Sequence, residues 1–592
     1  MIKQYNKQIE EHQKLIKGND MVSTWIGFIK LGIVIVIIFS LYKSITTTNN
    51  FMYILFGAII FFVIFTIWQS NVKKKIRLSR NAITIYQKHI DRITGDWISF
   101  ERTGEEYLEP DHIYAGDLDI VGKKSLFQLL NVTNTYHGEK RFIEDLLHPK
   151  YEIQEINERQ NAVQELSNNI SFVNTIEQKT LEIGTDDKIL KIINILNNRE
   201  TMKISSLFQN VIYCIPPIAT ISFIIGLYFK VLPLVIVGLG TLIIQGALWI
   251  ITLPKLQNTL QMIRKVPFGL KEYTTLFSYI CEQNFTSNKL KDIQNTIGNN
   301  TLSSTNAMKD LEKIINMISV GNNFIIYGIL NIFLLWDFLC YIRFQRWQEK
   351  YADNCENWFE GLGELESIMS FSILPMVSNH AVMPNIIDNE RRIDVTELGH
   401  PLLHESKRIN NDFSLHNEIC IISGSNMSGK TTFMRTLGIN LLLARIGSFV
   451  CAKSMDTAVF NLAASMRITD NLNEGISTFY AELKNIKSIL DIAKEEENTF
   501  FMIDEIFRGT NSRNRLEGAQ TVLKKLYEMH ISGIITTHDL ELCQLQEQYD
   551  KIENYHFTET YKDNEIVFNY QLKKGVSTTT NAKELMRMVG IM

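Results

Sequence analysis

Four apolar stretches, each close to the length that crosses a lipid bilayer, constrain the fold of this chain more than any other feature. They cover residues 26–42, 51–68, 211–229 and 231–253. A helix needs about 20 consecutive apolar residues to cross the hydrocarbon core. Lys30 lies close enough to one end of the first stretch to reach the headgroups, and membrane helices tolerate prolines such as those in the third. The spacing predicts two transmembrane helical hairpins, one N-terminal and one mid-chain.

Positive charges flank both hairpins but are nearly absent from the short connections within them. The flanking residues are Lys3, Lys7, Lys14, Lys17, Lys73, Lys74, Lys75, Arg77 and Arg80 for the first hairpin, and Lys191, Arg199, Lys203, Lys255, Arg264 and Lys265 for the second. Because lysine and arginine are enriched on the cytoplasmic side of membrane spans, both chain ends are expected in the cytosol. The alternative, long core helices of a soluble protein, is disfavoured by the lengths. We therefore predict a multi-pass membrane protein with four spans.

A fifth apolar run, 324–344, is more ambiguous because it carries Asp337 near its middle. A fifth span would place everything after it outside the cytosol. We therefore expect a buried helix of a soluble region here.

The strongest chemical signal lies in the last third of the chain. A short apolar strand pattern, 418–423, precedes Gly-Ser-Asn-Met-Ser-Gly-Lys-Thr and then a helical pattern. Such a P-loop lets backbone N–H groups approach phosphates, and the helix N-terminus favours an anion. Lys430 is expected to reach the β and γ phosphates, and Thr431 to ligate Mg²⁺. The predicted nucleotide-binding residues are Gly424, Ser425, Asn426, Met427, Ser428, Gly429, Lys430, Thr431 and Thr432.

Two further strands end in polar side chains of the kind that nucleotide hydrolysis uses. The strand 499–504 ends in Asp504 and continues into Glu505, and the strand pattern 533–537 is followed by His538. Parallel strands bring their carboxyl ends to one crevice. We expect Asp504 to hold Mg²⁺, Glu505 to activate the attacking water, and His538 to sense the γ-phosphate or position that water. Glu505, His538 and Lys430 are the predicted catalytic residues.

The composition adds little beyond exclusions. The formal net charge is −4, so the overall balance does not argue for nucleic acid. The seven cysteines are scattered and never spaced as CxxC, which suggests neither a disulfide framework nor a zinc site.

At these residues the chain resembles the MutS mismatch-repair family. The loop 424–431 resembles the family's phosphate loop with its unusual Asn-Met pair, and 504–510 and 536–538 resemble its Walker B and switch-histidine segments. The segment 470–479 is similar to its signature loop, and 119–166 is similar, more weakly, to the start of its helical core. The resemblance implies ATP and Mg²⁺ as ligands and a symmetric dimer, in which Ser477 of one subunit completes the site of the other.

The departures from the family concern the substrate rather than the ATPase. Nothing before Asp119 resembles the mismatch-reading domain, and Asn514-Arg515 stands where the family often has Asp-Gly. Two functions therefore stay open: a membrane-anchored MutS-like ATPase that binds mismatched or branched DNA, and an ATP-driven mechanical or scaffold protein on the membrane without a DNA substrate.

The predicted fold class is a multidomain chain of two transmembrane helical hairpins, a mostly α-helical core and lever region, and a C-terminal α/β P-loop ATPase domain of the ATP-binding-cassette type, which would be cytoplasmic. The predicted segments are 1–80 (N-terminus and first hairpin), 81–205 (first part of the helical region), 206–255 (second hairpin), 256–385 (return part of the helical region) and 386–592 (ATPase domain).

Overall fold

The computed structural model describes residues 1–46, 51–185, 193–194, 204–264, 270–299, 303–320, 324–388, 390–467, 478–496, 498–507, 512–562 and 565–577. The chain forms two compact units. Unit 1 comprises Met1–Asn131, Ile143–Gln178 and Met369–Met592, and unit 2 comprises Val132–Phe142 and Lys179–Ile368. Of the predicted segments, 1–80 and 386–592 therefore fall in unit 1, and 206–255 falls in unit 2.

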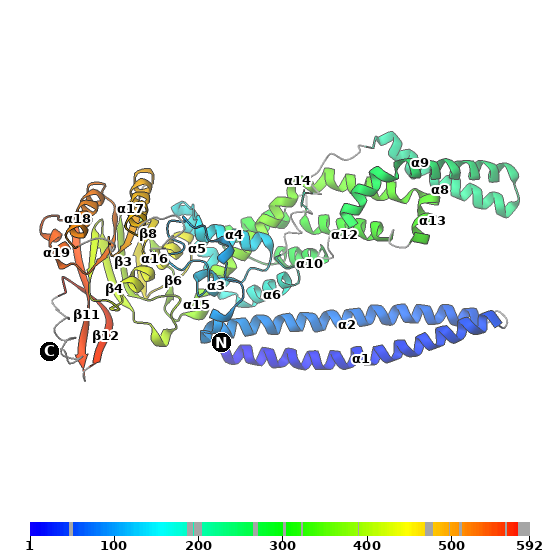
Figure 1. Cartoon of the computed structure of the whole chain (residues 1–592). Helices are drawn as coiled ribbons and strands as arrows, with labels where there is room; N and C mark the ends of the chain where they lie inside the picture. Colours follow the sequence, from blue (N-terminus) through cyan, green and yellow to red (C-terminus); the bar gives the residue numbers. More distant parts are fainter. Residues whose placement is uncertain are drawn as a thin grey trace. The chain divides into compact units, whose positions relative to one another are not determined.

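Unit 1 begins with a long helical hairpin, α1 (Ile2–Thr46) and α2 (Phe51–Thr94), whose helices lie side by side (Figure 1). At 1.5 Å per residue each helix is roughly 65 Å long, about twice what a bilayer core requires. Apolar side chains such as Phe28 (63% exposed) and Ile35 (62%) cover the half next to the connection. Lys30 donates a hydrogen bond to Gln69 of α2 at 3.2 Å, so its charge meets a polar group inside the hairpin.

Unit 1 also contains a central sheet, two smaller sheets and further helices. The helices are α3 (Leu126–Leu130), α5 (Ile153–Asn168), α15 (Leu374–Val377), α16 (Lys430–Ile446), α17 (Thr478–Glu495), α18 (Ser512–Glu528) and α19 (Leu540–Cys543). A four-stranded sheet has the order β2 (Asn385–Ile386), β7 (Ser454–Thr457), β3 (Arg392–Leu398), β4 (Asn411–His416), and β1 (Ala381–Val382) pairs with β6 (Val450–Cys451).

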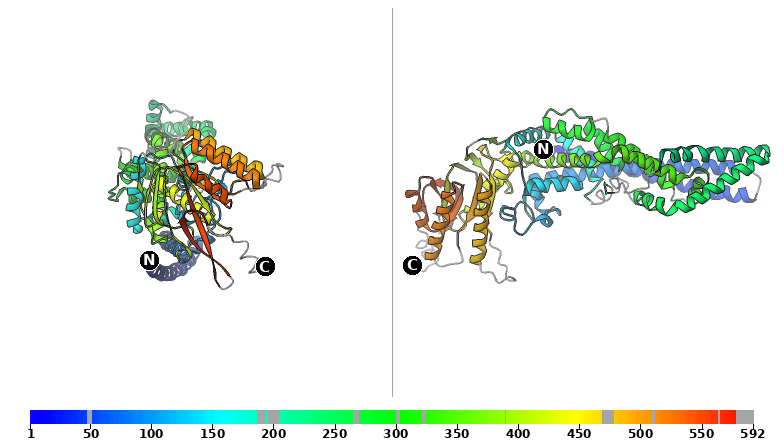
Figure 2. Two further views of the ribbon diagram at one scale, coloured as in Figure 1. Left: turned by 90° about the vertical axis from the view of Figure 1, so that its left-hand side faces the viewer. Right: turned by 90° about the horizontal axis from the view of Figure 1, so that it is seen from above.

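The central sheet has six strands. Their order is β12 (Glu565–Lys574), β11 (Ile552–Lys562), β5 (Ile419–Ser423), β10 (Ser532–Thr537), β9 (Thr499–Asp504), β8 (Asn461–Ser465), and all pairs are parallel except β11 with β12. Phe501 and Ile503 pack with Ile489 of α17 and Leu523 of α18 on one face (Figure 2, gold and orange helices). Met502 points to the other face, where its sulfur lies against Gly438 of α16. The carboxyl ends of β5, β9 and β10 thus share one edge.

Among its described residues, unit 2 consists of helices joined by short non-helical segments, and it contains no strand. It contains α8 (Ser206–Phe229), α9 (Leu232–Arg264), α10 (Leu270–Cys281), α11 (Asn288–Gln294), α12 (Ser304–Ser319) and α13 (Phe324–Leu334). Three helices contain residues of both units: α4 (Tyr136–Leu147), α6 (Ile170–Leu181) and α14 (Trp336–Phe371). α8 and α9 form the second apolar hairpin, which turns at Lys230 with a φ of 56°.

The fifth apolar run, which we expected to be one buried helix, consists of two. α13 and α14 meet at a bend of 77°, and Leu335 between them has a φ of 50°. The side chain of Asn331 accepts a hydrogen bond from the backbone N–H of Asp337 at 3.0 Å, which caps α14. The buried Asp337 carboxylate accepts hydrogen bonds from the Tyr327 hydroxyl and from Trp249 Nε1. Phe338 and Ile342 in the first turns of α14 are fully buried (0% exposed), whereas Ile329 on α13 is 51% exposed.

By length and composition, four described helices can cross a membrane, or five if the bent pair is a single span. The four are α1, α2, α8 and α9, which contain the four stretches that the sequence singled out.

Candidate functional site

The P-loop follows β5 and ends at the first residue of α16. Gly424, Met427 and Gly429 have φ angles of 153°, 66° and 110°, so the loop turns sharply between strand and helix. A Cβ at Gly429 would lie 3.1 Å from the Tyr570 ring, and a Cβ at Gly424 would lie 3.1 Å from the Phe557 carbonyl oxygen. A side chain at either glycine would therefore be crowded, and the positive φ angles would strain it.

Lys430, the first residue of α16, turns back over this loop. Its Nζ donates hydrogen bonds to the carbonyl oxygens of Gly424 and Ser425, each at 2.9 Å. The same Nζ lies 3.4 Å from His538 Nε2 and 4.0 Å from Glu505 Oε1. The Lys430 side chain is buried, so its charge is held at the centre of the predicted site.

Thr431 and Asp504 meet beside it. The Thr431 hydroxyl donates to Asp504 Oδ2 at 2.9 Å, and the Thr536 hydroxyl donates to Asp504 Oδ1 at 2.5 Å. Hydroxyl and carboxylate oxygens are the ligands that Mg²⁺ prefers, and Mg²⁺ normally completes its shell with phosphate oxygens and water. Among the residues that the structure describes, no group of three or more His, Cys, Asp or Glu side chains could hold a metal ion. The arrangement therefore suits a Mg²⁺ ion that takes two oxygen ligands from the protein and the others from a nucleotide and water, rather than an ion held by protein ligands alone.

Glu505 and His538 form a second contact at the same edge. Glu505 has a φ of 54°, an uncommon conformation for a residue other than glycine, and its N–H donates to the Thr536 hydroxyl at 3.1 Å. This turn at the end of β9 brings Glu505 Oε1 to 2.5 Å from His538 Nε2. The structure therefore brings together Lys430, Thr431, Asp504, Glu505 and His538, the residues that the sequence selected. Ser477, and Gly509 and Thr510 after Walker B, lie outside the described residues.

Ser428 of the P-loop carries a buried hydroxyl. The residue is 2% exposed, and among the residues that the structure describes its hydroxyl has no hydrogen-bond partner. A buried hydroxyl without a partner costs free energy unless a ligand satisfies it. A phosphate oxygen bound in the loop could accept a hydrogen bond from this hydroxyl.

The structure adds a cavity of about 300 Å³ that the sequence did not reveal. It adjoins the P-loop at Gly429 and Thr432, and its walls include Ile409, Phe557 and Tyr570. Apolar and aromatic walls beside a phosphate loop suit a nucleotide base. Tyr570 lies on β12, far along the chain from the loop, and only the pairing of β11 with β5 and β12 brings it near.

Arg515, which departs from the family pattern, has a defined contact. Its Nε and Nη2 donate to the two oxygens of Asp539 at 2.8 and 3.2 Å. Asp539 follows His538 directly, so this half-exposed ion pair joins α18 to the segment that carries the histidine.

Comparison with known proteins finds matches to one family. The family models MutS domain III and MutS domain V match residues 112–225 and 420–591. The DNA mismatch repair protein MutS of Prochlorococcus marinus (strain NATL1A) is 31% identical over 253 residues, which are 40% of this chain and 26% of that protein. The protein of the same name from Clostridium kluyveri is 24% identical over 522 residues, which are 79% of this chain and 58% of that protein. That of Clostridium botulinum (strain Okra) is 23% identical over 520 residues, which are 79% of this chain and 54% of that protein.

The chain is a member of the MutS family, with matches to its domains III and V. Members of this family are ATPases involved in mismatch repair. The chain spans 58% or less of the length of these relatives.

A histidine in the cavity beside the P-loop leads to a prediction about how stability depends on pH. Burial lowers the pKa of His400, which lines the cavity, from 6.5 to about 4. Below pH 6.5 the unfolded chain therefore binds a proton that the folded chain does not. As the pH is lowered from 6.5 to 4, this residue should therefore reduce the free energy of unfolding by about 1.4 kcal/mol per pH unit. Burial lowers the pKa of His137 in the same direction, so both residues contribute to the slope.

His400→Asn should flatten this slope when the free energy of unfolding is measured against pH. The same substitution at the exposed His404 controls for the loss of a histidine in general. An unchanged slope in His400→Asn would contradict a buried, neutral His400.

Proposed function

We propose that this chain is a membrane-anchored ATPase that binds and hydrolyses MgATP at an interface between two copies of itself. The observation that carries the proposal is the meeting of three strand ends, where Thr431 bonds to Asp504 and Lys430 lies within 4.0 Å of Glu505. A phosphate-binding loop, a metal-binding hydroxyl–carboxylate pair and an acid–histidine pair at one sheet edge match phosphoryl transfer to water.

The residues present fit a nucleotide and its metal. The N–H groups of 424–429 would receive the phosphates, the unpaired Ser428 hydroxyl would gain a partner, and Lys430 would exchange two loop carbonyls for phosphate oxygens. Thr431 and Asp504 would hold Mg²⁺, which when bound offsets the charge that builds on the phosphates. The cavity at Ile409 and Tyr570 would take the base.

Hydrolysis requires a base that removes a proton from water. Glu505 Oε1 would accept this proton, because it is the one carboxylate oxygen that lies next to both Lys430 and His538 among the described residues. His538, 2.5 Å away, would fix the orientation of the Glu505 carboxylate. Lys430 would keep its charge beside the phosphates throughout.

The dimer rests on the family resemblance rather than on a described contact. By that resemblance Ser477 of one copy would reach the nucleotide of the other, which gives a symmetric pair. Contacts made only in the closed pair would favour it when ATP is bound, and hydrolysis would release it.

Membrane anchoring is supported by the exposed apolar surface of the two hairpins. On α1, Phe28, Leu31 and Ile35 are each more than 60% exposed, and on α9 so are Ile243 and Ile244. Continuous apolar surface of this extent is unfavourable in water and favourable in lipid. We infer that α1, α2, α8 and α9 span the membrane and that the ATPase region is cytoplasmic.

DNA binding is the second candidate, because the relatives are named DNA mismatch repair proteins. ATPase assays of the detergent-purified chain with duplex DNA, branched DNA or lipid vesicles separate it from a purely membrane-directed function. Stimulation by DNA that weakens with salt would support a phosphate-binding surface. Stimulation by vesicles alone would support an ATP-driven mechanical or scaffold protein.

Glu505→Gln should stop hydrolysis without preventing nucleotide binding. The amide cannot accept the proton, so turnover should fall at least ~100-fold, while the affinity for ATP stays within about threefold. Single-turnover hydrolysis and equilibrium binding measure the two effects separately. Glu528→Gln, an exposed change on α18, is the matched control. If Glu505→Gln hydrolyses ATP as fast as the control, Glu505 is not the base.

The proposed topology makes a separate prediction. An epitope inserted between residues 46 and 51 should be accessible to antibody from outside intact cells, because this connection lies between two spans. An epitope at the C-terminus should become accessible only after the membrane is permeabilised. External labelling of the C-terminus, or release of the chain from membranes by alkaline carbonate, would contradict the four-span arrangement.

A further inference from the structure

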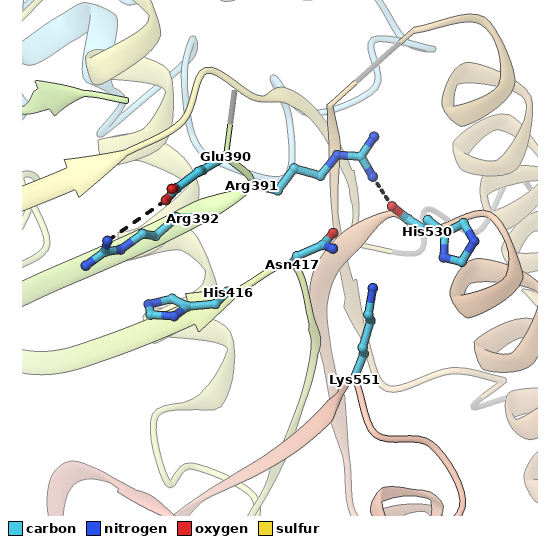
Figure 3. A pocket seen from close by; sticks show the side chains of 7 residues that line it. All are labelled: Glu390, Arg391, Arg392, His416, Asn417, His530 and Lys551. Carbon is cyan, nitrogen blue, oxygen red and sulfur yellow. Dashed lines mark hydrogen bonds and ion pairs between the residues drawn. The ribbon is translucent and has the colours of Figure 1, made fainter. Parts of the chain in front are cut away.

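A polar cavity of about 650 Å³ lies at the edge of the six-stranded sheet opposite the P-loop (Figure 3). Asn417, His530 and Lys551 line it, and each lies one or two residues before β5, β10 or β11 begins. The strands are parallel, so their amino ends point away from the nucleotide site. The cavity is therefore separate from the proposed ATPase site.

The charges on one side of this cavity balance one another. Arg392 forms an ion pair with Asp394 and lies 4.0 Å from Glu390, and His416 lies 3.0 Å from Asp394. Both acids of this side thus have basic partners. A charged ligand would therefore be attracted only weakly to this side of the cavity.

The other side of the cavity carries two cations, Arg391 and Lys551, which form no salt bridge with a carboxylate in the described part of the chain. Arg391 donates to two neutral acceptors, the Asn498 side-chain oxygen at 3.0 Å and the His530 carbonyl oxygen (Figure 3). These bonds fix the guanidinium, and neither acceptor is a carboxylate. Among the described residues, the Lys551 ammonium forms no salt bridge or hydrogen bond, although its charge interacts with that of the neighbouring Asp550. Asp550 also accepts a hydrogen bond from the Tyr527 hydroxyl at 2.6 Å.

The backbone holds these groups in place. The N–H of Asn417 donates to the Arg391 carbonyl at 2.7 Å, which ties the segment before β3 to the sheet edge. Arg391 in turn bonds to residues before β9 and β10. The arginine therefore keeps its position without a ligand, so a ligand would meet a preformed site.

We propose that this cavity binds a compact anion with several phosphate groups, such as pyrophosphate or tripolyphosphate. Arg391 and Lys551 would supply the charge, and Asn417 and His530 further hydrogen bonds. All the described residues that line the cavity are polar or charged, so recognition would depend on charge and not on stacking. The volume exceeds what one phosphate fills. Two cations in a hollow, neither of them in a described salt bridge, suit a small anion better than a duplex, which needs a row of basic residues along its backbone.

Isothermal titration of the full chain in detergent with tripolyphosphate tests this proposal. Because the P-loop also attracts phosphates, the titration uses Lys430→Ala as background. We expect one binding event in this background, weakened at least tenfold by adding Lys551→Gln. Lys524→Gln, an exposed change on α18, should leave it unchanged. The Lys551 side chain bonds to no described group, so Lys551→Gln should unfold at the same temperature as its parent.

Two results would overturn the proposal. The first is the absence of binding in Lys430→Ala, which would assign all phosphate affinity to the P-loop. The second is equal affinity with and without Lys551→Gln. A parallel titration with a short oligonucleotide distinguishes the source of the phosphate: if Lys551→Gln weakens only the oligonucleotide, the cavity belongs to a nucleic-acid surface and the small-anion proposal is wrong. Failure of ATP hydrolysis would not affect these outcomes.

Discussion

The hydrogen bonds of the Asp504 carboxylate hold three elements of the site in register. Thr431 reaches one oxygen from α16, and Thr536 reaches the other from β10, while Asp504 itself ends β9. These bonds are possible because β5, β10 and β9 are neighbours in one parallel sheet. The same strand order places Lys430 and His538 beside Glu505. Thus a single buried acid links strand order to the chemistry proposed for the site.

A second buried polar cluster joins the first hairpin to the body of unit 1. His89 of α2 lies 3.2 Å from Glu177, and Arg92 donates to the Leu129 and Asn131 carbonyl oxygens. All three side chains are nearly inaccessible to water. Leaving the donors of a buried charged group such as Arg92 without acceptors costs about 1–3 kcal/mol or more, so these bonds hold the base of the hairpin in place. In the proposed mechanism, movement of this body would therefore carry the hairpin with it.

Much of the site could be predicted from sequence because its chemistry is local. The P-loop, Asp504-Glu505 and His538 each follow a short apolar strand, and parallel strands bring such residues together. The apolar hairpins were visible for a similar reason, since a span needs a continuous apolar run. The bend at Leu335 was not predictable, because it depends on Asn331 and on Tyr327, Trp249 and Asp337 meeting in the fold. Tyr570 and the Arg391 cavity were missed because they arise from pairing between distant strands.

The most direct test of the central claim replaces Mg²⁺ by Mn²⁺ and follows the metal by electron paramagnetic resonance in the presence of ATP. The account predicts one Mn²⁺ coupled to phosphorus in each chain, with Asp504→Asn weakening its binding at least ~10-fold because a charged ligand is lost. Asp491→Asn on α17, which removes an exposed acid, should leave the signal unchanged. Equal Mn²⁺ affinity in Asp504→Asn, or Mn²⁺ without phosphorus coupling, would contradict a shared site for metal and nucleotide at this sheet edge.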